Sequence, residues 1–362
     1  MVPENSKITV GILFGGKSAE HEVSLQSAKN VYDAIDRDKF EPVLIGIDKS
    51  GKWLLNSDSR FLLNADDPRR ISLNPTGAQV AVIPESRGCM SGAAPAPEGL
   101  PPLPKLDVVF PILHGPFGED GTVQGLLKLA GIPFVGSGVL GSAVSMDKDV
   151  MKRLFRDAGL PCGKFLTYRL YDPLPFFAEV ITALGSPVFV KPANLGSSVG
   201  ISKVRNESEF SAAVSEAFKY DTKIIVEEFI KGREIECAVL GNERPIASIP
   251  GEIIPTHEFY SYEAKYLDDH GAKLEIPAKI DRESQKTIQE LSIKAFQTLC
   301  CEGLARVDFF LKDNGDVLIN EINTMPGFTR ISMYPKLWEA TTDAGFSYTE
   351  LITRLIELAM EK

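Results

Sequence analysis

The sequence predicts an α/β fold for this chain of 362 residues. An apolar run at residues 8–14 leads through Gly15-Gly16 into a helical pattern at 23–35, and strand, glycine-rich turn and helix in this order open an α/β domain. A second buried run at 107–113 ends in a turn rich in glycine and proline, before a helical pattern at 122–130. Loops that follow such strands are where α/β proteins bind ligands.

The composition limits the function. Hydrophobic residues make up 44% and charged residues 24%, which is typical of a globular protein. The net charge of -10 and the lack of a basic run argue against a nucleic-acid partner. Five cysteines without metal-ligand spacing do not form a disulfide framework and indicate a reducing compartment. With no signal sequence and no apolar run of about 18 residues, we expect a cytoplasmic protein without a membrane partner.

The first domain contains further expected elements. The runs at 43–47 and 132–135 predict strands, and the segment 84–105, rich in Pro, Gly, Ala and Ser, predicts a surface connection without a core of its own. Residues 11–18 match the Walker A pattern literally, but their spacer belongs to the first strand, whereas a phosphate cradle needs a loop there, so we reject this match. Glu20-His21-Glu22 is either a binding group or an acidic first turn favoured by the helix dipole.

The middle of the chain alternates between helices and strands. Helices are expected at 146–158 and 208–218, and strands at 187–192, 201–204 and 223–226.

The sequence Asn-Leu-Gly-Ser-Ser-Val-Gly at 194–200 joins two of these strands, and Lys191 precedes it. Small residues with free N–H groups suit a loop that covers phosphates, although an ordinary hairpin turn has the same composition. The carboxylates of residues 227–234 either accept hydrogen bonds from adenine and ribose or are surface charges.

The last third begins with a new sheet at 235–240. Residues 251–273 are long, irregular and rich in tyrosine, which suggests a lid or binding loop. Helices are expected at 282–299 and at 348–360, the latter amphipathic and structural.

The most informative stretch is a hairpin within residues 303–330. Asn314-Gly315 is the strongest signal for a two-residue turn. Counting outward from this turn places Asp313 opposite Asp316, Phe310 opposite Ile319, Asp308 opposite Glu321 and Arg306 opposite Asn323. Since residues two apart share a face, four polar side chains converge on one side: Arg306, Asp308, Glu321 and Asn323. The other face is then apolar and directed into a core: Val307, Phe309, Leu311, Leu318 and Ile322.

Two carboxylates opposite each other on paired strands repel, with Cβ atoms about 5 Å apart, unless a cation lies between them. Asp, Glu and Asn oxygens are ligands that Mg²⁺ prefers, and Arg306 beside them suits a phosphate or a developing negative charge. The alternative is a solvated hairpin face with incidental charges. Another turn length would shift the register and separate these side chains.

Several motifs together resemble those of the D-alanine–D-alanine ligase family of ATP-grasp enzymes. Each motif alone is weak, but their order along nearly the whole chain is highly specific. The resemblance rests on residues 15–24 (GGKSAEHEVS), 114–121 (HGPFGEDG), 146–148 (MDK), 191–192 (KP), 196–200 (GSSVG), 263–266 (EAKY), 306–308 (RVD) and 321–327 (EINTMPG).

The resemblance implies an ATP-grasp fold preceded by an N-terminal α/β domain of Rossmann-like, pre-ATP-grasp type. The implied domains are 1–140, which binds substrate; 141–226, the central subdomain with the glycine-rich loop; and 227–362, with the metal hairpin and the lid. Family members join two D-alanines for peptidoglycan precursors. ATP phosphorylates the first carboxylate, the second amine attacks the D-alanyl phosphate, and phosphate leaves. The family also suggests a homodimer.

The resemblance further implies roles for individual residues. Asp308, Glu321 and Asn323 resemble ligands of two Mg²⁺ ions, for which Mn²⁺ can substitute. Residues that resemble the contacts to ATP are Lys148, Lys191, Lys265, Ser197, Ser198, Glu227, Glu228, Ile230 and Glu234. Glu20 and His114 resemble contacts to the first D-alanine, and Ser332 and Met333 contacts to the second. Arg306 and the Gly327 N–H resemble the oxyanion stabilisers. Tyr266, hydrogen-bonding through Glu20 and Ser197, would close the lid.

Two other functions compete with this one. A related carboxylate–amine ligase could use D-serine or D-lactate as acceptor, and it would differ at Tyr266 and Ser332-Met333. Tyr266 favours an amine acceptor over a hydroxyl, because another residue tends to replace it in relatives that make D-alanyl-D-lactate. A regulatory module without catalysis would lack part of the metal set, which is complete here.

Overall fold

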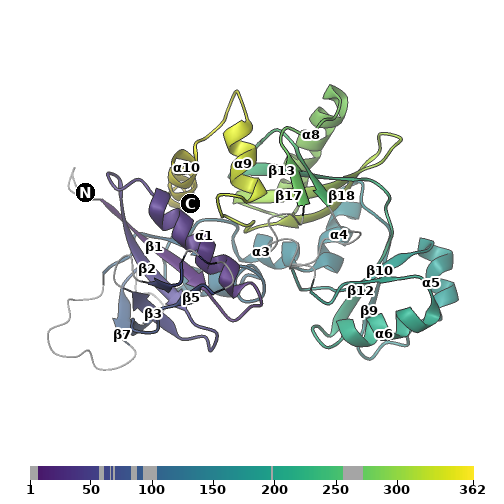
Figure 1. Cartoon of the computed structure of the whole chain (residues 1–362), viewed down its shortest axis with the longest axis horizontal. Helices are drawn as coiled ribbons and strands as arrows, with labels where there is room; N and C mark the ends of the chain where they lie inside the picture. The colour runs from purple at the N-terminus through teal and green to yellow at the C-terminus, as the bar shows by residue number, and fades with distance from the viewer. Residues whose placement is uncertain are drawn as a thin grey trace.

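The computed structural model describes residues 7–56, 61–65, 67, 70–82, 88–92, 104–196, 199–255 and 272–362. Three sheets follow one another along the chain, and Figure 1 shows the N-terminal sheet on the left, the central one on the right and the C-terminal one between them. None of the helices within these ranges is long and apolar enough to span a membrane.

The N-terminal sheet has six strands, in the order β7 (Met90–Gly92), β6 (Ala78–Val82), β3 (Trp53–Asn56), β2 (Phe40–Ile47), β1 (Ile8–Gly15) and β8 (Val108–Ile112). β1 pairs in parallel with β2 and β8, as an α/β domain requires. Helix α1 (His21–Ala34) covers one face and α2 (Thr122–Leu129) the other. A small ribbon is formed by β4 (Leu62–Leu63) and β5 (Ser72–Leu73).

One prediction for this domain was wrong. Residues 132–135 form only an isolated bridge between Phe134 and Val109, because Pro133 has no N–H to continue the ladder. Within the segment 84–105, the described residues 88–92 include β7, whose Met90 is buried against the N-terminal sheet and so belongs to the core of that sheet. The rejection of the Walker A match is confirmed, because β1 includes its spacer residues.

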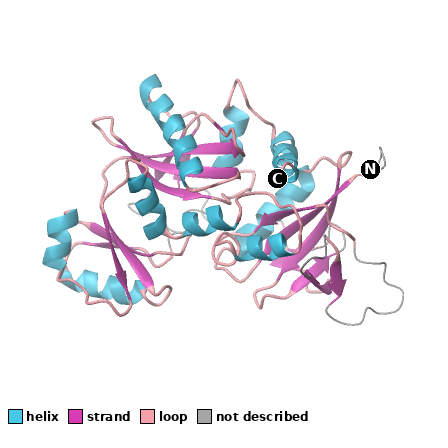
Figure 2. Cartoon of the chain, turned by 180° about the vertical axis from the view of Figure 1, so that it is seen from behind, coloured by secondary structure: helices cyan, strands magenta, loops and turns pink. Residues whose placement is uncertain are grey.

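The central sheet is antiparallel, in the order β11 (Ser202–Val204), β10 (Val188–Pro192), β12 (Lys223–Glu228) and β9 (Phe165–Arg169). Helices α5 (Phe177–Leu184) and α6 (Glu207–Ala217) pack on it to form a separate core. Figure 2, the view from behind, shows both helices on the outer side of this lobe. β12 runs across the predicted domain boundary at residue 226.

The helix expected at 146–158 is α4 (Lys148–Asp157), and a helix that was not predicted, α3 (Val139–Met146), precedes it. Asp147 separates them because its carboxylate accepts hydrogen bonds from the N–H groups of Asp149 and Val150, both at 3.1 Å, and so caps α4.

The C-terminal sheet has the order β16 (Ala272–Glu275), β15 (Gly251–Pro255), β13 (Arg233–Gly241), β17 (Gly303–Leu311) and β18 (Val317–Asn323), and β14 (Ile246–Ala247) pairs with β13. Helices α4 and α8 (Arg282–Thr298) cover one face. Helices α9 (Met333–Ala340) and α10 (Tyr348–Met360) lie on the other, and α10 also packs beside α1, so one core joins the two sheets (Figure 1).

The hairpin of β17 and β18 differs from the prediction at its turn. The loop has three residues, Asp313-Asn314-Gly315, because the N–H of Lys312 donates to the carbonyl of Asp316 (2.9 Å). Gly315 has a φ of 88°, the left-handed conformation that such a loop needs. Phe310 therefore lies opposite Leu318 and not Ile319.

A bulge restores the predicted register at the site. It lies beyond Phe309 and leaves Asn320 unpaired, so that Asp308 faces Glu321 and Arg306 faces Asn323, as predicted. Near the turn the faces are exchanged: Val317 and Ile319 are buried in the core, whereas Leu318 is only partly buried.

Candidate active site

Two cavities adjoin each other between the three sheets. The larger, of about 600 Å³, lies between the N-terminal domain and the C-terminal hairpin, and the smaller, of about 280 Å³, lies between the central and C-terminal sheets. They share the side chains of Lys148, Glu234 and Glu321.

Every predicted site residue within the described ranges lines one of these cavities. The larger contains Glu20, His114, Arg306, Asp308, Asn323, Gly327, Ser332 and Met333, and the smaller contains Lys191, Glu227, Glu228 and Ile230. Ser197, Ser198, Lys265 and Tyr266, together with most of the expected lid, lie outside the described residues.

Three carboxylates form a row across neighbouring strands at the floor of the larger cavity. Glu236 of β13 lies opposite Asp308 of β17, which lies opposite Glu321 of β18. Like charges placed in this way destabilise a sheet unless cations accompany them. The cations here are Arg306 and Lys148, whose ammonium group is 3.5 Å from Glu321.

Arg306 lies between two of these carboxylates. Its Nε and one terminal nitrogen donate to both oxygens of Asp308, at 2.7 and 2.6 Å. Its Nε is also 2.9 Å from Glu236, whose side chain is only 7% exposed. The guanidinium plane is thereby fixed, and its remaining N–H groups can bind a phosphate or a developing oxyanion in the cavity.

The donor set fits a divalent metal that is shared with phosphates. Among the residues that the structure describes, no three His, Cys, Asp or Glu side chains converge as in a preformed metal cage. Asp308 and Glu321 face each other, and the Asn323 amide lies 3.0 Å from Asp308. Mg²⁺ is commonly held in this way, by one or two carboxylates completed by substrate phosphates and water.

Lysines line the smaller cavity around a buried carboxylate. Glu227, with a side chain 8% exposed, pairs with Lys191 and with Lys152, the latter at 2.9 Å. Burial raises the pKa of the Glu227 carboxyl, but the two ammonium groups outweigh burial and hold this pKa well below its usual range. Burial lowers the pKa of Lys191, but Glu227 and Glu321 outweigh burial and raise it, so Lys191 is a fixed cation.

The opposite wall of the larger cavity is built by loops of the N-terminal domain. His114 lies at the end of β8 with its Nδ1 atom 3.1 Å from the carbonyl oxygen of Met325, so Nδ1 carries the proton and donates it. Burial lowers the pKa of His114 more than the nearby Glu20 carboxylate raises it, which leaves a neutral ring. His114 thus anchors the loop that carries Gly327.

The far end of this cavity is formed by the loop before α9. The hydroxyl of Ser332 accepts from the N–H of Thr329 (3.0 Å) and lies 2.7 Å from the Thr329 hydroxyl. A Cβ atom at Gly327 would lie 3.0 Å from the Ser332 hydroxyl, so the backbone approaches this group as closely as a glycine permits.

Sequence reasoning assigned no role to three charged residues at this site. Glu119 accepts from the N–H of Gly115 (2.8 Å), and burial, together with the Glu20 carboxylate, raises its pKa well above its ordinary value. Glu236 alternates with Glu234 along β13, a signal that the sequence contained but that pointed to no partner. Lys152 follows Lys148 by one helical turn and so faces the smaller cavity, which Lys148 also lines.

The comparisons with known proteins agree over the whole chain. The family described as "D-ala D-ala ligase N-terminus" matches residues 9–137, and "D-ala D-ala ligase C-terminus" matches residues 154–357. A D-alanine–D-alanine ligase of Oceanobacillus iheyensis is 58% identical over 98% of this chain and 96% of its own, and D-alanine–D-alanine ligase A of Escherichia coli is 56% identical over the same shares.

Solved structures give the same result. The D-alanine–D-alanine ligase of Coxiella burnetii superposes with a TM-score of 0.83 at 38% identity, covering 98% of this chain and 94% of its own. The VanG D-Ala:D-Ser ligase of Enterococcus faecalis superposes with a TM-score of 0.84 at 38% identity, covering 98% and 100%.

Proposed function

Because the chain belongs to the D-alanine–D-alanine ligase family, an ATP-grasp family, we propose which of its residues perform each step of the family's reaction. The enzyme joins two D-alanines with ATP, by way of D-alanyl phosphate, and releases ADP and phosphate. The product is a precursor of peptidoglycan. The observation that carries the assignment of residues is the row of Glu236, Asp308 and Glu321 with Arg306 fixed between two of them.

The nucleotide is proposed to occupy the smaller cavity. Glu228, Ile230 and Glu234 line it and are assigned to the adenine and ribose. Lys148 and Lys191 lie where this cavity meets the larger one and are assigned to the phosphates. Ser197, Ser198 and Lys265 are assigned to the phosphates by the family resemblance.

Glu227, placed by the resemblance among the adenine contacts, has its side chain engaged by Lys152 and Lys191. We assign this carboxylate to holding Lys191, and only its backbone to the adenine.

A divalent metal is implied by the family, and Asp308, Glu321 and Asn323 are proposed to hold two Mg²⁺ ions, replaceable by Mn²⁺. When bound, these ions neutralise phosphate charge. Arg306 and Lys148, the present partners of Asp308 and Glu321, would be available to the transferred phosphoryl group if a metal engaged these two carboxylates. Glu236 keeps a second anchor on Arg306, which therefore stays in the cavity with its N–H groups presented to the oxyanion.

The two D-alanines are proposed to lie along the larger cavity. Glu20 binds the ammonium of the first, and His114, whose ring is committed to Met325, fixes the loop that presents the Gly327 N–H. Ser332 and Met333 lie at the far end and are assigned to the carboxylate of the second D-alanine. Tyr266, through Glu20 and Ser197, is assigned to closing the lid and to selecting an amine acceptor.

We further propose a cytoplasmic homodimer. ATP is a cytoplasmic substrate, and all five cysteines are free thiols, as a reducing compartment requires. Leu129 at the end of α2 is 66% exposed, and Leu140 of the adjacent α3 is 60% exposed, and we propose these two side chains as contacts to a second copy. Sedimentation velocity of Leu140→Glu tests this: a monomer supports the assignment, and an unchanged dimer places the interface elsewhere.

The proposed function is tested by phosphate release from ATP and Mg²⁺, measured together with product formation. D-alanine is supplied alone or with D-serine or D-lactate as acceptor, and L-alanine and no amino acid are the controls. One phosphate per dipeptide with D-alanine alone is the expected result. Faster formation of D-alanyl-D-serine or D-alanyl-D-lactate would show that D-alanine is not the preferred acceptor. Phosphate release without any amino acid would contradict the proposed ligase activity.

A further inference from the structure

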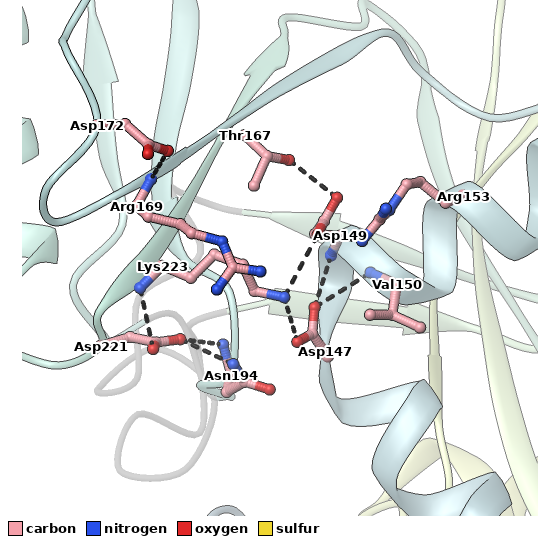
Figure 3. A network of polar contacts seen from close by, with 10 residues as sticks. All are labelled: Asp147, Asp149, Val150, Arg153, Thr167, Arg169, Asp172, Asn194, Asp221 and Lys223. Atoms are coloured by element: carbon pink, nitrogen blue, oxygen red, sulfur yellow. Dashed lines mark hydrogen bonds and ion pairs between the residues drawn. The ribbon is translucent and has the colours of Figure 1, made fainter.

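Lys223, the first residue of β12, holds two carboxylates that none of the steps above uses. Its ammonium group pairs with Asp147 and lies 3.3 Å from Asp149, and Figure 3 shows it directed at both. The side chains of Lys223 and Asp149 are only 11% and 7% exposed. These two aspartates flank Lys148 in the sequence, at the beginning of α4.

The cluster of Lys223, Asp147 and Asp149 connects the central and the C-terminal lobe, which have separate cores. α4 inserts Met151 and Phe155 into the core of the C-terminal sheet. β12 contributes Ile224 and Val226 to the core of the central sheet. The ion pairs of Lys223 therefore cross the junction between these two lobes. At the other end of the same strand, Glu227 pairs with Lys152 of α4, so α4 is fastened to β12 twice.

Backbone hydrogen bonds tie Lys148 to the same junction. Its N–H donates to the carbonyl of Ala193 at 3.0 Å, and the N–H of Ala193 donates to the carbonyl of Lys223 at 3.0 Å. The Lys148 ammonium group donates to the carbonyl of Leu195 at 2.9 Å. Lys148 and the residues that lead into the glycine-rich loop, here called the stem of the loop, are thus held by one set of contacts.

The stem of the loop is fixed from its other side by Asp221. Its Oδ2 atom accepts from the N–H and from the side-chain amide of Asn194, both at 2.9 Å, and its Oδ1 accepts from the N–H of Lys223 at 3.1 Å (Figure 3). Thr167 of β9 completes the cluster by donating to Asp149 at 3.0 Å. The cluster therefore joins the beginning of α4, β9, the beginning of β12 and the stem of the loop.

We propose that Lys223 is a positioning residue for the nucleotide, which holds Lys148 and the stem of the 194–200 loop at the phosphates through Asp147 and Asp149. The proposal rests on the proposed contact of Lys148 with ATP. Without the Lys223 ammonium group, Asp147 loses the cation that pairs with it, and Asp149 keeps only its 2.9 Å ion pair with Arg153, whose side chain is 53% exposed. The two carboxylates then relieve their repulsion by drawing water into the lobe junction. A displacement of 1 Å there is enough to cost about a hundredfold in a positioned reaction.

The test is the equilibrium affinity for ATP with Mg²⁺, measured by calorimetry without any D-alanine, so that turnover plays no part. Lys223→Met should weaken binding by about tenfold or more, Lys223→Arg should restore it to within about threefold, and the KM for D-alanine at saturating ATP should change by less than about twofold. Lys219→Met is the matched control, because Lys219 is an exposed lysine of the same lobe that pairs with Glu216. This control should bind ATP as the parent does.

A folded Lys223→Met variant, verified by circular dichroism, that binds ATP within twofold of the parent overturns the proposal. A loss that Lys223→Arg does not recover overturns it as well. If Lys223→Met does not fold, Thr167→Val removes one hydrogen bond to Asp149 and should weaken ATP binding by a few-fold; unchanged binding then overturns the proposal. Lys148→Gln distinguishes failure of the proposed Lys148 contact with ATP from failure of the Lys223 proposal. If Lys148→Gln binds ATP as the parent does, the assignment of Lys148 to the phosphates fails. If Lys148→Gln binds ATP weakly but Lys223→Met binds it normally, only the positioning role of Lys223 is refuted.

Discussion

Replacement of Glu227 by glutamine tests how the nucleotide cavity is held together. The change preserves the shape of the side chain but removes the only negative charge of the triad with Lys152 and Lys191. The two ammonium groups, 3% and 13% exposed, would then lose the counter-ion that they share, and Lys191 would keep the charge interactions with Glu321 and Glu234. Breaking a buried ion pair in this way costs about 3–5 kcal/mol, so we expect a loss of that size in the free energy of unfolding at pH 7.

The pH dependence gives the prediction a second, independent part. The pKa of Glu227 in the folded protein lies below its ordinary value of 4.5, so the stability that the carboxylate contributes is fully present above pH 4.5 and is lost as the pH falls toward the folded pKa. The difference between parent and Glu227→Gln should therefore be constant from pH 5.5 to 7.5 and should shrink at pH 4.

Urea unfolding followed by circular dichroism at each pH measures this difference. Glu216→Gln is the matched control, because Glu216 pairs with Lys219 on the exposed surface of the same lobe, and such pairs contribute little. A loss below about 1 kcal/mol in Glu227→Gln, or a difference that grows on acidification, would refute the interpretation of Glu227 as a buried counter-ion.

Three further predictions concern the chemical steps. Asp308→Ala should abolish metal-dependent turnover while circular dichroism remains that of the parent, and normal activity would remove Asp308 from the metal site. Arg306→Ala should lower kcat by about two to three orders of magnitude, as the loss of an oxyanion donor does, and a change of only a few-fold in steady-state kinetics would contradict that role. Tyr266→Phe should raise the use of D-lactate relative to D-alanine in a competition assay, and an unchanged ratio would disprove the role of Tyr266 in selecting the acceptor.

The hairpin of β17 and β18 shows which parts of the candidate site could be predicted from the sequence. The two-residue turn at Asn314-Gly315 was wrong by one residue, and the bulge at Asn320 was not foreseen, yet the two errors cancel at Asp308 and Glu321. The predicted pairing of Asp308 with Glu321 was therefore right for a reason that was partly wrong. Between the turn and the bulge, where nothing cancels, Leu318 was placed on the wrong face.

Contacts between segments that are distant in the sequence could not be predicted from the sequence. Glu236 reaches Arg306 because β13 pairs with β17, and no local pattern sets the register of strands whose paired residues are 62 or more residues apart along the chain. His114 contacts a carbonyl 211 residues later. Lys223 meets Asp147 across 76 residues, and neither residue type is unusual where it stands in the sequence. Local turn and strand signals predicted residues that gather at the candidate site, whereas the residues that support them depend on the tertiary fold.

The measurement that tests the account most directly follows oxygen from substrate to product. D-alanine labelled with ¹⁸O in its carboxylate is incubated with enzyme, ATP and Mg²⁺, and the phosphate released is analysed by mass spectrometry. If the carboxylate is phosphorylated and the amine of the second D-alanine then displaces phosphate, each phosphate carries one ¹⁸O atom from the substrate. Phosphate without label, formed together with dipeptide, would contradict the acyl phosphate and the roles built on it for Arg306, Asp308 and Glu321.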